Sequence, residues 1–419
     1  MLSITIVLPK ANNMKKYFPL FILGFLFFAP QVHASGYLYT RSITVTSTTS
    51  IASGTNSNFP MLFSGTYTWL KASSSGGRIQ NLTTAPNGGQ EPADLIFVTS
   101  TPSASGGAWS CGTSLNFETE SYTSSTGAIN DWVNVPTMQA NQVIYACYGN
   151  SSVSADQSHP SSTWNSNYGG VWHLANPTSS VSTYDSVDGN IGTNNGPVGA
   201  TTGMIDGAGI WGTHTTDAIV TDIASTSTQR TYSLWTYRTG LGGGSLGRMF
   251  DKRTSGAQSD VLLYDTTCNS YGYDRVWTSG VAEWCISLPS ANVWHYIVVT
   301  YNSSSGSNSP IIYVDGVSSS IVYTNGYPAS GSLVNNSDDY VIGNRTNDNA
   351  RNFQGILDEF RLTNNIQTSD WILTEYNNQA SPSTFYAVGS EQTAVANATG
   401  TPMFYIMGAL RILGKLIFP

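Results

Sequence analysis

Two pairs of acidic residues are the first places where this sequence could carry out chemistry. Glu118 and Glu120 stand two residues apart in the segment LNFETESY, whose apolar–polar alternation predicts a strand with both carboxylates on one face. Asp358 and Glu359 are adjacent, so a regular strand would send them to opposite faces. Hydrolysis of a glycosidic bond needs two carboxyl groups about 5–10 Å apart across one cleft. We interpret the first pair as a solvated strand face, and we predict no catalytic residue.

A literal Gly-x-Ser-x-Gly sequence occurs at 243–247. A nucleophile elbow places its serine between a strand and a helix, which exposes the hydroxyl on a sharp turn. A strand is expected over 232–237, but the residues between this motif and the next Thr-Ser-Gly are too few for a helix of usual length. The glycine-rich run over 240–247 therefore predicts a flexible hairpin loop.

The four cysteines allow three disulfide pairings. We favour Cys111–Cys147 and Cys268–Cys285, because each pair then lies within one predicted domain. The five histidines are scattered along the chain, and the cysteines do not have metal-ligand spacing with them, so a zinc site is not expected. Disulfides are typical of proteins outside the reducing cytosol.

Aromatic residues gather between Cys268 and Cys285. A loop that is held by a disulfide and carries aromatic and charged side chains is a reasonable surface for a glycan. The candidate ligand-binding residues are Tyr271, Tyr273, Asp274, Trp277 and Trp284. The alternative is that these rings pack beneath a long hairpin.

The composition limits the classes of partner. Only 10% of the 419 residues are charged, against about 25% in a typical soluble domain. The formal net charge is -8, and no basic patch is evident that could neutralise the phosphates of a nucleic acid or of an anionic membrane. We therefore expect no nucleic-acid partner.

The N-terminal segment has the pattern of a secretory signal peptide over 14–34, with 1–13 upstream of the expected start. Two lysines precede an apolar run over 17–29, and small residues at Val32 and Ala34 are typical of a cleavage site. The run is shorter than the ~20 residues that a membrane-spanning helix needs. We expect a secreted or surface-exposed protein with no transmembrane helix in the mature chain.

Short runs of β-branched and aromatic residues, separated by Gly, Asn and Ser, predict strands in both halves of the chain. No segment over 36–150 has a sustained helical period, and a short helix is expected over 366–377. We predict an all-β fold with two β-sandwich domains, at 37–150 and 168–390, joined by a linker over 151–167. Residues 391–419 form a small-residue spacer and an apolar tail. The tail is either a docking segment for a protein partner or a poorly ordered terminus.

The stretch over 294–362 resembles a known family. Its segments WHYIVVTY, IYVDG and GILDEFRL are similar to the signature strands of the laminin-G-like, concanavalin A-like jelly roll. Asp315-Gly316 is a two-residue turn signal between apolar segments. The opening segment GVWHL and the order of the segments over 165–390 fit the same family. The resemblance implies a jelly roll for the second domain.

Residues 37–150 resemble a bacterial family still called domain of unknown function 2341. The segments that carry the resemblance are YLYTRSITV, NFPML, PADLIF, LNFETESY, WVNVP and IYACYGN. In that family the module commonly precedes a laminin-G-like module, which is the order here. The family has no established catalytic residues, so none is carried over.

Laminin-G-like jelly rolls often hold one calcium ion, and the resemblance implies Asp185, Asn190 and Asp358 as its ligands. Oxygen ligands of this kind suit calcium. One inserted residue in the Asp-Ser loop makes Asp188 an alternative to Asp185. The alternative role of Asp358 is to cap a turn by accepting hydrogen bonds from backbone amides.

These resemblances imply non-catalytic binding of a glycan or a cell-surface polysaccharide, as an adhesin or lectin-like module, although a fold does not fix a function. One alternative is a structural or assembly protein of the cell surface, whose apolar tail docks to a partner. The other is a glycan-active hydrolase that uses Glu118 and Glu120, although the Glu-x-Asp-x-x-Glu signature of laminarinase-type enzymes is absent.

Overall fold

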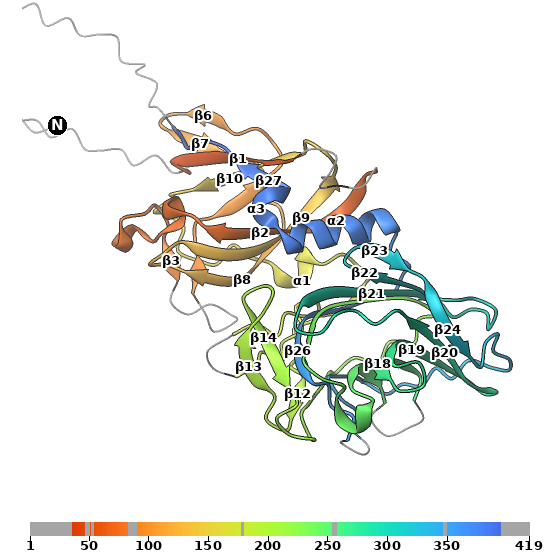
Figure 1. Ribbon diagram of the computed structural model, residues 1–419. Helices are drawn as coiled ribbons and strands as arrows, with labels where there is room; N and C mark the ends of the chain where they lie inside the picture. Colours follow the sequence, from red (N-terminus) through yellow and green to blue (C-terminus); the bar gives the residue numbers. More distant parts are fainter. Residues whose placement is uncertain are drawn as a thin grey trace, which may run out of the picture. The chain divides into compact units, whose positions relative to one another are not determined.

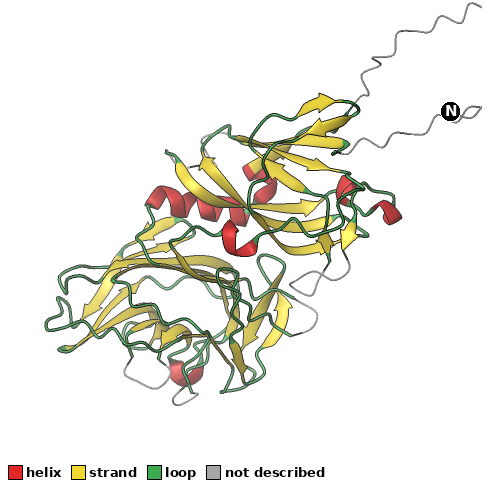
Figure 2. Ribbon diagram, turned by 180° about the vertical axis from the view of Figure 1, so that it is seen from behind, coloured by secondary structure: helices red, strands yellow, loops and turns green. Residues whose placement is uncertain are grey.

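The computed structural model describes residues 36–46, 51, 54–82, 90–176, 180–253, 258–346 and 350–394. They all lie within one unit of the chain, Ser35–Pro419. The predicted signal peptide over 14–34 and all of the predicted tail beyond residue 394 lie outside the described residues. Strands make up most of the regular secondary structure of the described chain (Figure 1, Figure 2), and the predicted all-β sandwich fold class is confirmed.

The first sandwich contains a five-stranded and a three-stranded antiparallel sheet. The larger has the order β27-β1-β10-β5 with β28 also beside β1, and the smaller has the order β2-β9-β8. Two short hairpins, β3-β4 and β6-β7, accompany them. The strands are β1 (Tyr39–Val45), β2 (Asn56–Thr66), β3 (Asn81–Leu82), β4 (Glu91–Pro92), β5 (Ile96–Val98), β6 (Ser103–Ser105), β7 (Ala108–Ser110), β8 (Phe117–Thr123), β9 (Ala128–Met138), β10 (Val143–Tyr148), β27 (Tyr386–Val388) and β28 (Gln392–Thr393).

The core of the first sandwich follows from the period of two along its strands. Phe59, Met61 and Phe63 in β2 alternate toward the interior, where they join Phe97 from β5 and Ile144 from β10 in one buried cluster. Burial of each such side chain stabilises the fold by about 1.5–3 kcal/mol. The opposite face of the smaller sheet is therefore left to contact another part of the chain.

The second sandwich contains two eight-stranded antiparallel sheets. One has the order β13-β14-β26-β16-β21-β22-β23 with β11 beside β26, and the other has the order β12-β15-β25-β17-β18-β19-β20-β24. The strands are β11 (Tyr168–Trp172), β12 (Thr193–Asn195), β13 (Gly199–Thr202), β14 (Gly207–Trp211), β15 (Ala218–Val220), β16 (Gln229–Arg238), β17 (Arg248–Lys252), β18 (Asp260–Asp265), β19 (Ser270–Trp277), β20 (Gly280–Ile286), β21 (Trp294–Asn302), β22 (Ile311–Val314), β23 (Val317–Ser319), β24 (Ile321–Asn325), β25 (Tyr340–Ile342) and β26 (Gly355–Thr363).

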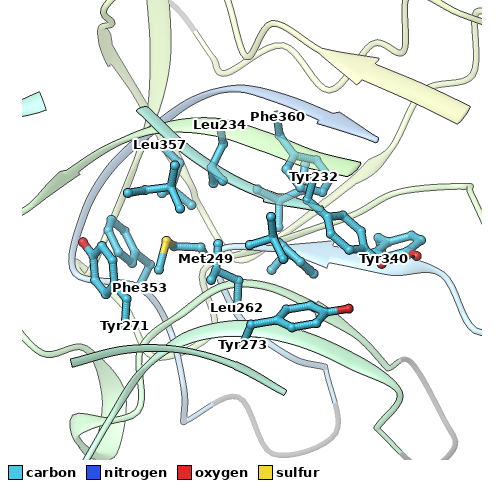
Figure 3. Close-up of a cluster of buried hydrophobic side chains, with 14 of the residues drawn as sticks. Tyr232, Leu234, Met249, Leu262, Tyr271, Tyr273, Tyr340, Phe353, Leu357 and Phe360 are labelled. Carbon is cyan, nitrogen blue, oxygen red and sulfur yellow. Dashed lines mark hydrogen bonds between the residues drawn. The ribbon is translucent and has the colours of Figure 1, made fainter. Parts of the chain in front are cut away.

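The two large sheets enclose the main core of the molecule. Figure 3 shows Tyr232 and Leu234 of β16 among Met249 of β17 and Leu262 of β18, all of them fully buried. Alternate residues of β16 point the other way, and Trp235 joins a second cluster with Ile372 on the outer face of its sheet. A helix therefore covers the face of this sheet that does not pack on its partner sheet.

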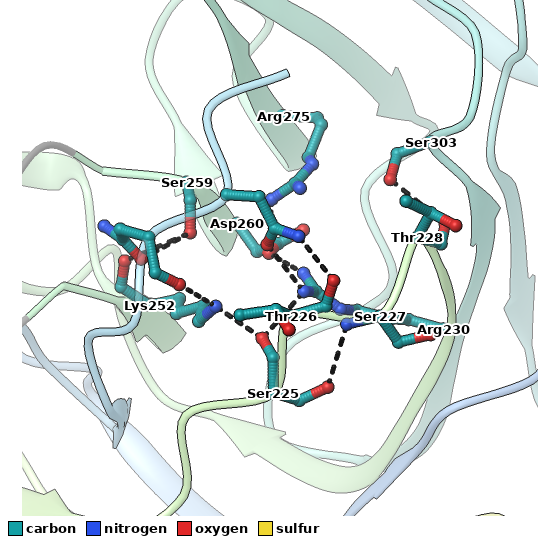
Figure 4. Close-up of polar contacts among 12 residues, drawn as sticks. Ser225, Thr226, Ser227, Thr228, Arg230, Lys252, Ser259, Asp260, Arg275 and Ser303 are labelled. Carbon is teal, nitrogen blue, oxygen red and sulfur yellow. Dashed lines mark hydrogen bonds and ion pairs between the residues drawn. The ribbon is translucent and has the colours of Figure 1, made fainter.

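A buried ion network lies beside this core (Figure 4). Arg230 and Arg275 both donate to Oδ2 of Asp260, and the Tyr273 hydroxyl donates to Oδ1 at 2.7 Å. Burial alone would raise the pKa of Asp260, but the two arginines outweigh it and lower this pKa below its ordinary value. Because every one of these groups is buried, the network holds β16, β18 and β19 together.

The C-terminal segment returns to the first sandwich. The helices are α1 (Pro160–Thr163), α2 (Ser369–Ala380) and α3 (Pro382–Phe385), with 3-10 turns η1 (Thr68–Leu70), η2 (Ser73–Ser75) and η3 (Gly243–Ser245). Asn378 in α2 exchanges two hydrogen bonds with the backbone of Leu62 in β2. Strand β27 then pairs with β1. The predicted second domain, 168–390, includes β27, whereas the strand pairs with the first sandwich.

Both predicted disulfides are confirmed. Cys111 is bonded to Cys147 in β10, and Cys268 is bonded to Cys285 in β20. Ser245, the serine of the Gly-x-Ser-x-Gly sequence, lies in η3 and is followed by strand β17, so the helix that a nucleophile elbow needs is missing there. No helix among the described residues has the length and apolar character needed to cross a membrane.

Candidate ligand-binding pocket

A pocket of about 490 Å³ opens between strand β8 of the first sandwich and the segment that follows β11 in the second. Most of its lining residues have polar side chains, with carboxylates, hydroxyls and amides beside two tyrosines. The lining residues are Gln90, Glu118, Thr119, Glu120, Ser121, Tyr122, His173, Ala175, Asn176, Ser180, Val181, Ser182, Thr183, Tyr184, Ile191 and Asp206. The pocket therefore contains both glutamates of the first acidic pair.

The prediction that Glu118 and Glu120 form a solvated strand face is wrong. Their side chains are only 6% and 1% exposed, because the second sandwich covers this face of β8. Glu118 Oε2 accepts from the Trp164 indole at 2.7 Å, and Oε1 accepts from the Ser186 hydroxyl at 2.6 Å. The pairing of β8 with β9 is irregular between Thr119 and Ser121, so Glu120 occupies a bulge.

The second acidic pair reaches the same region through another bulge. The register between β26 and β16 shifts where Asp358 and Glu359 stand, and Glu359 has a φ of 54°, which is uncommon for a residue other than glycine. Glu359 Oε1 lies 2.8 Å from His173 Nδ1. Asp358 Oδ2 instead accepts from the backbone amides of Met204 and Ile205 at 2.8 and 3.0 Å.

His173 is the centre of this carboxylate network. Its Nδ1 lies 3.5 Å from Glu120 Oε2, and its Nε2 lies 3.4 Å from Glu118 Oε2. Burial alone would lower the pKa of His173, but the carboxylates of Glu359, Glu120 and Glu118 outweigh it and raise this pKa well above its ordinary value. The ring also stacks on Trp132, with centroids 5.7 Å apart. The imidazolium is thus held by charge on its edges and by an aromatic ring on its face.

Arg361 neutralises the carboxylates behind His173. Its guanidinium donates to Glu359 Oε2 at 2.6 Å and to Glu375 Oε1 at 2.7 Å. It also lies over the ring of Trp132 at 4.2 Å. Burial alone would raise the pKa of Glu359, but His173 and Arg361 outweigh it and lower this pKa below the ordinary value. Glu359 is therefore an ionised structural partner with both oxygens occupied.

One oxygen of Glu120 has spare capacity, as do Asp358 Oδ1 and Glu375 Oε2, and of these three residues Glu120 is the one that lines the pocket. Oε2 accepts from the Trp132 indole at 2.8 Å, but the buried Oε1 has no hydrogen-bond partner. Burial and the nearby charge of Glu359 raise the pKa of Glu120 well above its ordinary value, although His173 opposes them. An unsatisfied buried oxygen next to a pocket is a place where a ligand donor would be favoured.

This geometry suits binding better than hydrolysis. A two-carboxylate mechanism needs an acid and a base or nucleophile that both reach the substrate. Glu118 and Glu359 each have both oxygens engaged by protein donors, which leaves Glu120 as the glutamate of the pocket lining that has an oxygen without a protein donor. Glu120, held by the Trp132 indole, offers an anchor for a ligand.

Three groups of described residues have side-chain atoms close enough together to surround a metal ion. One of them, Cys268, Glu283 and Cys285, contains the disulfide and so offers no thiolate. Ligand atoms of Asp265, Asp274 and Glu283 lie within 4.8 Å of one another, twice a typical Ca–O distance of about 2.4 Å. Burial and the neighbouring carboxylates raise the pKa of Asp274 to about 8 and that of Glu283 to about 7. Glu120, His173 and Glu359 also lie within 4.8 Å. There, however, a protonated imidazole has no lone pair to offer a metal.

The side chains of the three predicted calcium ligands make separate hydrogen bonds, although the backbone amide of Asp185 donates to the carbonyl of Asn190 at 2.9 Å. Asp185 Oδ1 accepts from the backbone amides of Val171 and Val187 at 2.9 and 3.0 Å. The side-chain amide of Asn190 donates to Asp188 at 2.9 Å, and Asp358 binds backbone amides as described above. The calcium site on Asp185, Asn190 and Asp358 stays a prediction.

The predicted ligand residues between Cys268 and Cys285 lie on two faces of the β19–β20 hairpin. The rings of Tyr271, Tyr273, Trp277 and Trp284 all belong to the buried core of the second sandwich. Asp274 points to the opposite face and stands across from Glu283. The structure thus favours the packing interpretation for the four aromatic residues, because a buried ring offers no platform to a sugar.

The second sandwich has a recognisable relative. Residues 212–373 match the family model of the concanavalin A-like lectin/glucanases superfamily. The match covers a concanavalin A-like domain within the jelly roll that the sequence predicts over 168–390. No curated protein matches the chain.

Several solved structures share part of this fold. The binding domain of Paraclostridial Mosquitocidal Protein 1 is 13% identical, with a TM-score of 0.38, over 50% of this chain and 52% of that one. Domain 4 of AbnA, an extracellular arabinanase from Geobacillus stearothermophilus solved with arabinotriose, is 15% identical, with a TM-score of 0.35, over 50% and 98%. The receptor-binding domain of botulinum neurotoxin C/D mosaic serotype is 11% identical, with a TM-score of 0.37, over 52% and 52%.

The chain thus spans about half the length of the mosquitocidal binding domain. Likeness at this level of identity and TM-score shows a shared type of fold and carries no argument about a ligand.

Sequence reasoning found the two glutamates of the pocket but missed the groups that surround them. His173 stands in the segment GVWHL, whose pattern predicts a strand and does not indicate a role for the histidine. Trp164 stands in the segment predicted as a linker, although it is buried. The one available signal was the placement of a tryptophan and a histidine beside apolar residues in a chain with only five histidines.

Proposed function

We propose that the chain is a non-catalytic, lectin-like carbohydrate-binding protein that acts outside the cell or at its surface, and that the glycan enters the pocket over β8. The observation that carries this proposal is the combination of a free carboxylate oxygen on Glu120 with the half-buried ring of Tyr184 in one polar pocket. Sugars are bound by hydrogen-bond acceptors for their hydroxyls together with an aromatic face for their C–H groups.

Three further observations support the proposal. The two disulfides fit an oxidising compartment. Residues 212–373 of the second sandwich match the concanavalin A-like lectin/glucanases superfamily. Hydroxyl and amide side chains such as Ser182, Thr183 and Asn176 supply additional hydrogen-bonding groups around the pocket. The resemblance of residues 37–150 to domain of unknown function 2341 stays part of this proposal, as does export through the segment 14–34.

A glycan array on the purified protein tests the proposal, run once in calcium and once with a chelator. We expect binding that Tyr184→Ala reduces at least about tenfold, because the loss of an aromatic contact typically costs more than 1 kcal/mol. Tyr237→Ala is the matched control, since Tyr237 is a half-buried tyrosine on β16 outside the pocket lining. Binding that survives Tyr184→Ala but not Tyr237→Ala would contradict the pocket assignment.

The chelator arm decides whether calcium takes part. Loss of binding with the chelator would favour an ion at Asp185, Asn190 and Asp358, and unchanged binding would leave the ion without a role in recognition. If a folded sample binds no glycan under either condition, that result would favour the alternative of a structural or assembly protein. A chain ending at Ala394 then tests that alternative, because it removes the apolar tail and keeps β28.

A further inference from the structure

The charge around the pocket is strongly one-sided. Three of its lining residues are acidic, namely Glu118, Glu120 and Asp206, and His173 is the basic residue among them. None of the described residues that line the pocket is a lysine or an arginine. Behind the lining lie three more acidic residues, Asp358, Glu359 and Glu375, and one further cation, Arg361, which pairs with Glu359 and Glu375. The network therefore holds more carboxylates than cations.

Both cations are already committed to protein carboxylates. His173 is shared by Glu118, Glu120 and Glu359. Arg361 is bound by Glu359 and Glu375. Glu120 is the carboxylate whose free oxygen is buried at the pocket, with its side chain 1% exposed. A buried carboxylate without a full set of donors is unfavourable, so a positively charged ligand group would be stabilised at this oxygen.

We propose that the glycan taken by this pocket carries a free, protonated amine, as in an oligosaccharide of deacetylated hexosamine, and that the ammonium group donates to Glu120 Oε1. This inference rests on the proposed carbohydrate-binding function and names its ligand class. An ammonium group offers three donors. It can satisfy Glu120 Oε1 and also approach the ring of Tyr184, whose face attracts cations.

The proposal predicts a distinctive pH dependence. Glu120 is faced by His173 after β11, by Asp206 before β14, and by Asp358 and Glu359 on β26. Glu118 stands two residues away on the same strand, and Arg361 pairs with Glu359. In the free protein the surplus of acids favours a proton on Glu120. An arriving ammonium group favours the ionised carboxylate instead, so binding releases this proton. Affinity should therefore rise with pH until the ligand amine itself loses its proton.

Isothermal titration of the full chain with a glucosamine hexamer and with its N-acetylated counterpart tests the proposal. The two ligands differ in charge but share a backbone. We expect the amine form to bind about tenfold or more tightly, the effect of one charge-assisted hydrogen bond, with an affinity that increases as the pH rises above the ordinary glutamate pKa of 4.5. Glu120→Gln should abolish the preference, and Asp206→Asn should reduce it.

Asp222→Asn provides the control, because it removes an exposed carboxylate that does not line the pocket. Equal binding of both hexamers, a preference for the acetylated form, or a preference that survives Glu120→Gln and Asp206→Asn in folded protein would overturn the proposal. Loss of the preference on addition of chelator would also overturn it, since an ion would then be the cation at the site.

The outcomes also separate this inference from the proposed function. If neutral glycans bind on the array, but the amine hexamer does not bind and no rise of affinity with pH is seen, the proposed carbohydrate binding is retained and the proposed preference for an amine is rejected. If no glycan of any charge binds, the proposed function itself falls.

Discussion

The indole N–H of Trp164 donates to Glu118 Oε2 at 2.7 Å, although Trp164 stands just before the second sandwich and Glu118 belongs to the first. This bond turns a strand that would otherwise face solvent into one wall of a pocket. The same carboxylate accepts from Ser186 in the second sandwich. The pocket exists because residues from both sandwiches meet on the outer face of β8.

Removal of the Glu118 carboxylate should therefore destabilise the whole chain. Glu118→Ala leaves the Trp164 indole and the Ser186 hydroxyl buried without their acceptor, and we expect a loss of about 2–4 kcal/mol in the free energy of unfolding. Glu118→Gln should lose less, because its carbonyl oxygen still accepts from Trp164. Denaturation in urea measures both. A Glu118→Ala variant as stable as Asp222→Ala would contradict this account.

His173 should make stability depend on pH in a defined direction. Its pKa is raised in the folded state above the ordinary 6.5, so its stabilising contribution is complete below about pH 6.5 and is lost as the pH rises through the folded-state pKa. The difference in melting temperature between the wild type and His173→Gln should thus shrink as the pH increases above about 6.5. A difference that grows over this range would show that His173 is not held as a cation.

The contribution of Glu359 to stability should depend on pH in the opposite direction to that of His173. Its pKa is lowered by His173 and Arg361 against the effect of burial. Its contribution is therefore present above the ordinary value of 4.5 and is lost as the pH falls through the folded-state pKa. Acid titration of the wild type against Glu359→Gln, followed by circular dichroism, checks this. The variant should show the weaker dependence on acid, and an identical profile would contradict the assignment.

Arg361 should be the most costly member of the network to remove. Arg361→Met leaves Glu359 and Glu375 buried without their cation, and breaking a buried pair in this way costs about 3–5 kcal/mol. Arg361→Lys should recover only part of the loss, because an ammonium group cannot bind both carboxylates and stack on Trp132 as a guanidinium does. Urea denaturation of both variants provides the test. Equal stability of the Lys variant and the wild type would argue against the stacked geometry.

The two disulfides should differ in their contribution to stability. Their cysteines are 36 and 17 residues apart in sequence. The chain-entropy model then gives about 4 kcal/mol for Cys111–Cys147 and about 3 kcal/mol for Cys268–Cys285. Paired Cys→Ser variants at each site, compared by thermal unfolding, measure the difference. A larger loss at Cys268–Cys285 would show that local packing outweighs loop entropy there.

Much of the fold could be predicted because its signals are local. The strand pattern over 294–302 reappears as β21, and the turn signal Asp315-Gly316 joins β22 to β23 with positive φ at both residues. The cysteine pairing also followed from sequence, since each pair closes within one sandwich. Such features depend on neighbouring residues and on periodicity, which a sequence displays directly.

The burial of Glu118 could not be predicted in this way. An alternating strand shows which residues share a face, but it does not show what covers that face. The same limit applies to the domain boundary near β27. The three residues of β27 have a strand pattern, but the pattern does not show that the strand pairs with β1. The bulge at Glu359 depends on pairing with β16, so the adjacent acids appeared to be a regular strand.

Hydrogen–deuterium exchange with and without the strongest ligand from the glycan array tests the central claim most directly. If the glycan binds in the pocket over β8, amide exchange should become slower in β8 (Phe117–Thr123) and in 180–184, and it should change little in β18 to β20. Protection confined to β18, β19 and β20, near Asp265, Asp274 and Glu283, would contradict the claim and place the ligand on the other face of the second sandwich.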